Sequence, residues 1–159
     1  MKSAQPHFSK GLTAGALLSL FLSGVIPVMP AFADQGSAPA ALGKTKSLAA
    51  TQHEIVMLLM KKKEYEKAAV EANKIFDMKW PEDQEPLLLK ELLILSDQFL
   101  QHGQASLGLD LIKKNSKCFK QNLSQVKILK EKGYLYKNLG QNDKALECFQ
   151  EAMDLENKN

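Results

Sequence analysis

The fold is decided by residues 126–159, which read VKILKEKGYLYKNLGQNDKALECFQEAMDLENKN. Two apolar stripes at helical spacing lie on either side of the polar segment 140–143 (GQND). A small residue on each side, Gly133 and Ala145, is expected to face an aromatic side chain on the other, so that two backbones approach closely. The stretch therefore predicts an antiparallel helical hairpin with the packing residues Leu129, Gly133, Tyr136, Ala145, Phe149 and Ala152.

This hairpin resembles a tetratricopeptide repeat (TPR), a helix–turn–helix unit of about 34 residues. The sequence departs from the family pattern at Lys132, which replaces a Leu, and at Asn157, which replaces the closing Pro. The resemblance implies an interaction scaffold that binds other proteins. It is carried by Gly133, Tyr136, Ala145, Phe149 and Ala152 at the family's Gly, Tyr, Ala, Phe and Ala positions, and by Leu129 in place of its Trp.

Two earlier pairs of apolar segments repeat the pattern. Ala68 and Gly108 hold the position of Ala145, at successive spacings of 40 and 37 residues. Segments rich in turn-forming and polar residues, 80–86 and 116–123, separate the pairs. The sequence therefore predicts an all-α, TPR-like fold, a short right-handed solenoid of about three antiparallel helical hairpins. The predicted hairpins span about residues 47–80, 86–116 and 124–159.

Residues 1–33 have the pattern of a secretory signal peptide. Lys2 and Lys10 give a basic start, residues 12–26 are apolar and uncharged, and residues 31–33 (AFA) suit a signal peptidase. The alternative is an uncleaved membrane anchor. Residues 34–46, rich in small residues, predict a flexible tether before a domain at 47–159. We expect an exported bacterial protein, periplasmic or secreted, with no membrane span after signal cleavage.

Composition and motifs argue against several classes of function. The 21 basic residues are all Lys and the formal net charge is only +3, so we expect no nucleic-acid partner. The sequence contains no Gly-rich phosphate loop, no zinc-protease His motif and no nucleophile elbow. His53 and His102 have no partner at a metal-ligand spacing. We therefore predict that the chain is not an enzyme and has no catalytic residue, metal or cofactor.

Cys118 and Cys148 are the two cysteines. A pair suggests a disulfide in an oxidising compartment. Their positions in the predicted hairpins differ by about seven residues, or ~10 Å along a helix axis, which exceeds the Cα separation that a disulfide spans. The sequence leaves open whether the two are bonded. A thiol-redox protein using Cys118 and Cys148 is an alternative function, although no His or Asp is placed to activate either thiol.

A stripe of lysines marks the candidate binding surface. Lys127, Lys130, Tyr134 and Lys137 recur at steps of three and four residues, so they share one side of a helix. In the TPR family the first helices of the hairpins line a groove, and the resemblance implies that the stripe lies in it. We therefore predict a scaffold or adaptor of the cell envelope that binds an acidic or C-terminal peptide segment in the front-helix groove. The alternative is a solvated lysine face without a partner.

The last predicted helix offers a second surface. Leu146 and Met153 lie on the edge that a further repeat would cover, and solenoids generally need a polar cap at such an edge. We expect both side chains to be exposed, and we hypothesise that this docking edge binds a copy of the chain or another partner. A self-assembling scaffold, hence a homo-oligomer, is therefore an alternative function. A small apolar patch without a partner is the other interpretation.

Overall fold

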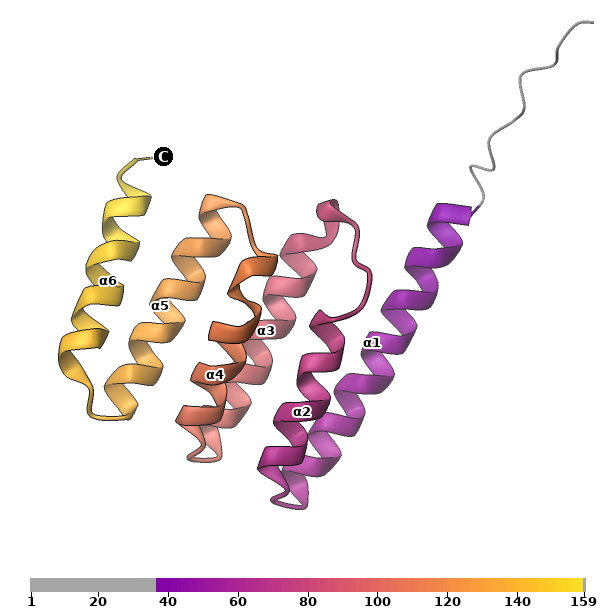
Figure 1. Ribbon diagram of the computed structural model, residues 1–159, viewed down its shortest axis with the longest axis horizontal. Coiled ribbons are helices and arrows are strands. Elements are labelled where there is room, and N and C mark those ends of the chain that lie inside the picture. The colour runs from indigo at the N-terminus through magenta and orange to yellow at the C-terminus, as the bar shows by residue number, and fades with distance from the viewer. Residues whose placement is uncertain (1–36, 159) are drawn as a thin grey trace, which may run out of the picture. The chain divides into compact units, whose positions relative to one another are not determined.

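The computed structural model describes residues 37–158, which form helices and turns and contain no β-strand (Figure 1). The described residues confirm the predicted all-α fold of three antiparallel helical hairpins. Two 3-10 turns, Glu82–Gln84 and Ser116–Cys118, lie in the connections between hairpins. The helices are α1 (Ser37–Lys61), α2 (Tyr65–Phe76), α3 (Glu85–Gln101), α4 (Ala105–Asn115), α5 (Asn122–Asn138) and α6 (Asn142–Glu156).

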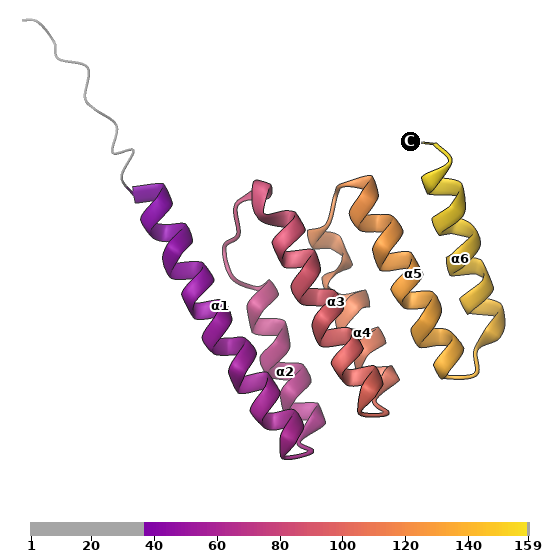
Figure 2. The same ribbon diagram turned by 180° about the vertical axis from the view of Figure 1, so that it is seen from behind.

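The hairpins α1–α2, α3–α4 and α5–α6 follow one another in chain order. The first helices α1, α3 and α5 lie on the side that faces the viewer in Figure 2, and α2 and α4 lie on the side that faces the viewer in Figure 1. Contacts between neighbouring hairpins run from α2 to α4, from α3 to α5 and from α4 to α5. We call α1, α3 and α5 the front helices.

The three hairpins share one type of turn. In each turn the residue two positions before the next helix has a positive φ: Lys63 (61°), Gly103 (73°) and Gly140 (72°). Glycine adopts this conformation without steric cost and often ends a helix in this way. Because the turns coincide, the hairpins share one register with offsets of 40 and 37 residues. In each turn an N–H donates to a carbonyl five residues earlier, at 2.8–2.9 Å: Glu64 to Leu59, Gln104 to Phe99 and Gln141 to Tyr136.

Small residues allow the two helices of each hairpin to pack closely. A Cβ on Gly133 would lie 2.6 Å from the Phe149 ring, so α5 and α6 approach through this glycine. In the middle hairpin a Cβ on Gly108 would lie 3.0 Å from the carbonyl oxygen of Ser96. The predicted packing residues of the last hairpin are inside it: Leu129, Gly133, Ala145 and Ala152 are buried, and Tyr136 and Phe149 are partly buried.

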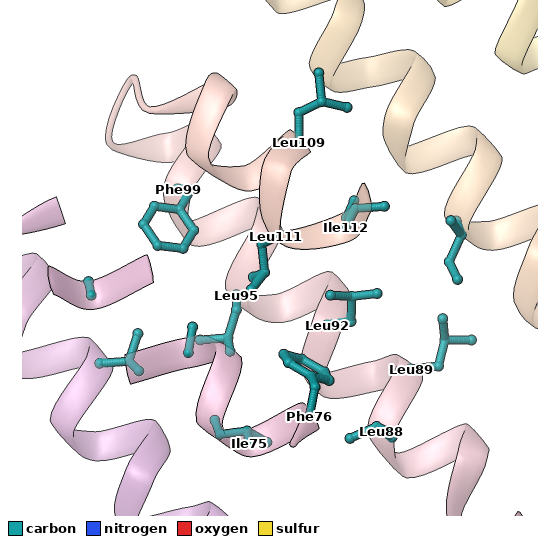
Figure 3. Close-up of a cluster of buried hydrophobic side chains, with 14 of the residues drawn as sticks. Ile75, Phe76, Leu88, Leu89, Leu92, Leu95, Phe99, Leu109, Leu111 and Ile112 are labelled. Atoms are coloured by element: carbon teal, nitrogen blue, oxygen red, sulfur yellow. The ribbon is translucent and has the colours of Figure 1, made fainter. Parts of the chain in front are cut away.

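The largest hydrophobic cluster lies between the first and second hairpins. Figure 3 shows side chains of α2, α3 and α4 converging there, among them Phe76, Leu95 and Ile112. Phe99 and Leu111 are fully buried in the same cluster. Burial of such side chains contributes about 1.5–3 kcal/mol each, so this cluster is the main source of stability. A second, smaller cluster of Val126, Leu129 and Ala152 lies between α5 and α6.

Buried polar groups tie the hairpins to one another. The Glu85 carboxylate at the start of α3 accepts hydrogen bonds from the backbone N–H groups of Lys120 (3.1 Å) and Gln121 (3.0 Å), just before α5. Burial acts to raise the pKa of Glu85, but these bonds and one from the Ser124 hydroxyl hold the pKa below its usual value. A carboxylate at a helix N-terminus is favoured by the helix dipole. Glu85 therefore fixes the second hairpin against the third.

The first helix begins earlier than predicted. We predicted a flexible tether over residues 34–46 and a helix from about residue 47, whereas α1 begins at Ser37. The small residues that suggested a tether include several alanines, and Ala is the strongest helix former. Pro39 lies in the first turn, where its missing N–H costs no hydrogen bond. The predicted signal peptide, residues 1–33, lies outside the described residues, as does the start of the predicted tether.

Candidate functional site

The front helices form a surface with three hollows, which we call the front-helix groove. The first hollow has a volume of about 520 Å³ and lies between α1 and α3. Its lining is mostly apolar, so we call it the apolar hollow. The apolar side chains that matter for the argument are Ala49 and Ala50 of α1, Leu87 and Ile94 of α3, and Trp80 of the α2–α3 connection.

Local sequence explains why this hollow is open. Ala49 and Ala50 on α1 are small, so they leave space where larger side chains would fill it. The Trp80 indole N–H donates to the carbonyl of Ile75 at 2.8 Å, which holds the ring beside the end of α2. Leu87 is 42% exposed and Ile94 is 37% exposed, so both can contact a bound segment. Apolar side chains that remain accessible in a hollow are typical of a binding site.

The rim of the apolar hollow carries charges of both signs. Nδ1 of His53 on α1 lies 2.6 Å from Oε1 of Glu91 on α3, so this pair bridges the two helices. Lys46, Glu54 and Lys90 also line the hollow. The rim can therefore form hydrogen bonds with the backbone of a segment whose apolar side chains fill the hollow.

The other two hollows lie between α3 and α5, with volumes of about 590 Å³ and 470 Å³. Lys127 lines the first of them, and Tyr134 and Lys137 line the second. Both hollows are also lined by Asp97 and Glu131. The groove is therefore not uniformly positive here, because two carboxylates lie among the predicted lysines.

The Glu131 carboxylate is partly buried between α3 and α5. Burial raises the pKa of Glu131 above its usual value, and Asp97 acts in the same direction. The Ser96 hydroxyl opposes this by donating to Oε1 of Glu131 at 2.5 Å. Glu131 is thus held by α3 and helps to join α3 to α5.

The structure separates the four predicted groove residues into two groups. Lys127, Tyr134 and Lys137 line the α3–α5 hollows, and the Tyr134 ring also packs edge-on against Phe149 at 5.2 Å between ring centroids. Lys130 forms an ion pair with Glu156 of α6, at 2.7 Å from Nζ to Oε1. Its charge is therefore partly neutralised at the α5–α6 contact. Peptide binding by the stripe stays a prediction.

Sequence reasoning missed the apolar hollow and Asp97. The hollow depends on the gap between α1 and α3, and the spacing of these two helices cannot be read from either segment alone. Asp97 could have been found from the register, since it is the α3 equivalent of Tyr134.

The predicted docking edge lies on α6. Leu146 is 57% exposed and Met153 is 60% exposed. Nearby, the Tyr136 ring lies under two cations, with Nζ of Lys113 at 5.3 Å and Nζ of Lys144 at 5.6 Å from its centroid. These cation–π contacts join α4, α5 and α6. Docking at the edge stays a prediction.

The two cysteines are free thiols in the structure. Cys148 is buried, and this burial raises the pKa of the thiol. A raised pKa opposes formation of the thiolate, which is the reactive form. Within residues 37–158, no three His, Cys, Asp or Glu side chains come together as a metal ion would require.

None of the helices described in residues 37–158 combines the length and apolar character that a membrane span needs.

The last hairpin, with its close α5–α6 contact at Gly133, matches a family model. The family model of the tetratricopeptide repeat matches residues 126–159. Residues 126–159 are therefore similar to one tetratricopeptide repeat. Repeats of this family mediate binding to other proteins. The hairpins α1–α2 and α3–α4 share its turn and register but precede the matched residues.

Neither the comparison with curated proteins nor that with solved structures gives a match to this chain.

Proposed function

We propose that this protein is a scaffold or adaptor that binds a peptide segment of another protein in the front-helix groove. The apolar hollow carries the proposal, because Ile94, Leu87 and Trp80 remain accessible beside a polar rim. A segment would place one or two large apolar side chains in this hollow. Its flanking acidic residues or C-terminal carboxylate would lie near Lys127 and Lys137.

The energetics support this mode of binding. Each large apolar side chain removed from water contributes about 1.5–3 kcal/mol, so two would supply much of a micromolar affinity of about −8 kcal/mol. Exposed charge pairs contribute less, about 0.2–1 kcal/mol each. The apolar hollow is therefore expected to set affinity, and the lysines to set which segments bind.

We further propose that the protein acts in the cell envelope of a bacterium, in the periplasm or outside the cell. The support is the pattern of residues 1–33, with a basic start, an uncharged apolar run and small residues at 31–33. Mass spectrometry of the protein from its own cells would identify its first residue, and an N-terminus at Asp34 is expected.

A displayed library of random peptides tests the groove. We expect selected peptides to carry a large apolar residue with acidic neighbours, and Ile94→Glu to weaken their binding at least tenfold, because a buried unpaired carboxylate is costly. Lys127→Glu with Lys137→Glu should reduce the preference for acidic peptides.

Val70→Glu is the matched control for Ile94→Glu. Val70 is 61% exposed on α2, outside the hollows of the front-helix groove, so its substitution should leave peptide binding unchanged. Thermal unfolding would establish that both variants stay folded. If Ile94→Glu binds the selected peptides as tightly as the unsubstituted chain, the apolar hollow is not the binding site.

Self-assembly is a second candidate function, because Leu146 and Met153 are exposed on the docking edge.

A further inference from the structure

The described part of the chain ends in two apolar faces. We call the outward side of the first hairpin the N-terminal face, where Leu48, Ile55 and Leu58 of α1 are exposed. We call the outward side of α6 the C-terminal face, with Leu146 and Met153. Leu58 is 55% exposed and Leu146 is 57% exposed.

The common register allows the burial of these residues to be compared with that of their equivalents in the other hairpins. With offsets of 40 and 37 residues, Leu48 and Ile55 correspond to Leu88 and Leu95 of α3. Both equivalents are buried. Leu58 corresponds to Leu135 of α5, which is 0% exposed. Each apolar residue of the N-terminal face therefore has an apolar equivalent that is buried in one later hairpin, whereas its other equivalent is a half-buried polar residue: Gln98, Gln125 or Lys132.

The C-terminal face follows the same rule. Leu146 of α6 corresponds to Leu109 of α4, which is 4% exposed. Met153 corresponds to Phe76 of α2, which is also buried. In Figure 3, Leu109 projects from α4 beside the ribbon of α5. The remaining equivalents, Ala69 and Ser116, are half-buried, so each position is buried in one earlier hairpin and partly covered in the other.

One contact inside the chain shows how such faces meet. A Cβ on Gly108 of α4 would lie 3.3 Å from Cδ2 of Leu135, so the Leu135 side chain packs directly on α4 beside Leu109. The equivalent residues are Ala145 of α6 and Leu58 of α1. A second copy could therefore place its Leu58 against α6 as Leu135 is placed against α4.

Charge favours this pairing of unlike faces. Four exposed acids lie along α6 around Leu146 and Met153: Asp143, Glu147, Glu151 and Asp154. Exposed lysines lie on α1 and in the turn after it: Lys44, Lys61, Lys62 and Lys63. The hollow beside Ile55 is lined by charges of both signs from α2: Glu66, Lys67 and Glu71. Two C-terminal faces would bring acids against acids, whereas pairing the C-terminal face of one copy with the N-terminal face of another brings the acids of α6 near these lysines.

We propose that a second copy of this chain docks head to tail, with its N-terminal face on the C-terminal face of the first, so that the stack of hairpins continues across the interface. Such an interface joins two different surfaces of the same chain. It therefore leaves one face of each kind open, and the assembly grows with protein concentration.

Sedimentation of the full chain at increasing concentration tests the proposal. We expect the unsubstituted chain to form dimers and larger species at high micromolar concentration. Leu58→Glu and Leu146→Glu should each weaken self-association at least tenfold, because each blocks one of the two faces. Both residues are more than half exposed, so neither variant should unfold, and circular dichroism would check this. Ile94→Glu, which changes the front-helix groove and neither end face, is the control that should associate normally.

An equimolar mixture of the two variants separates this proposal from its alternatives. Leu58→Glu keeps an intact C-terminal face and Leu146→Glu keeps an intact N-terminal face. The mixture should therefore form a dimer of one copy of each variant and no larger species. A monomeric unsubstituted chain, normal association of Leu58→Glu, or a mixture that stays monomeric would each overturn head-to-tail docking.

Discussion

Gly133 carries no side chain where the Phe149 ring occupies the space that a Cβ would need. The sequence predicted this small-against-aromatic contact from one hairpin. It did not predict how residues from different hairpins meet, such as Gly108 against Leu135, or Ser96 donating to Glu131. The first kind of contact follows from spacing within a repeat, whereas the second depends on the angle at which successive hairpins stack.

Gly133→Ala should destabilise the protein. Ala is favoured over Gly inside a helix by about 1 kcal/mol. The added Cβ, however, would lie 2.6 Å from the Phe149 ring, and such overpacking costs about 1–3 kcal/mol. We expect a lower free energy of unfolding in urea denaturation.

The background Phe149→Leu provides the control for this substitution. Leu is smaller than Phe at the contact, so Gly133→Ala should cost less in that background than in the unsubstituted chain. Equal costs in the two backgrounds would show that the ring moves aside, and that the close approach does not depend on the glycine.

The turn that joins the two helices could be predicted from the sequence in the second and third hairpins, but not in the first. Gly103 and Gly140 mark two of them directly, because glycine accepts positive φ. The first turn has Lys63 at the equivalent position, where the sequence gives no sign of a positive φ. Only the φ of 61° and the equivalent hydrogen bond show that this turn has the same conformation as the other two. The start of α1 was predicted too late, because the small residues of 34–46 were interpreted as a tether although several of them are alanines, which favour a helix.

Lys63→Gly should stabilise the first hairpin. A residue with a Cβ in the left-handed region costs about 1–2 kcal/mol, and glycine loses about 0.5–1 kcal/mol more entropy on folding. The expected gain in the free energy of unfolding is therefore about 0.5–1 kcal/mol. Thermal and urea unfolding would measure this gain.

Lys62→Gly is the matched control for Lys63→Gly. Lys62 precedes Lys63 in the same turn and does not have a positive φ, so glycine should give no gain there. A loss of stability in Lys63→Gly would mean that the Lys63 side chain makes a contribution larger than its backbone strain.

Across the described residues, contacts run mainly between neighbouring helices, as in other repeat proteins. α4 packs against α2, α3 and α5, whereas α6 packs chiefly on α5. The sequence predicted the order of the stack, because the repeats can be read from it. It did not predict the apolar hollow, because the separation of α1 and α3 is set by the packing of α2 on α4.

This unequal packing predicts unequal resistance to local unfolding. Amide hydrogen exchange at low micromolar concentration should show the strongest protection in α3 and α4, and weaker protection in α6. At concentrations where copies associate head to tail, protection should rise in α6 and in α1, which form the two faces, with little change in α3. Leu146→Glu should abolish that rise. Uniform protection of all six helices at low concentration would instead mean that the hairpins unfold as one cooperative unit.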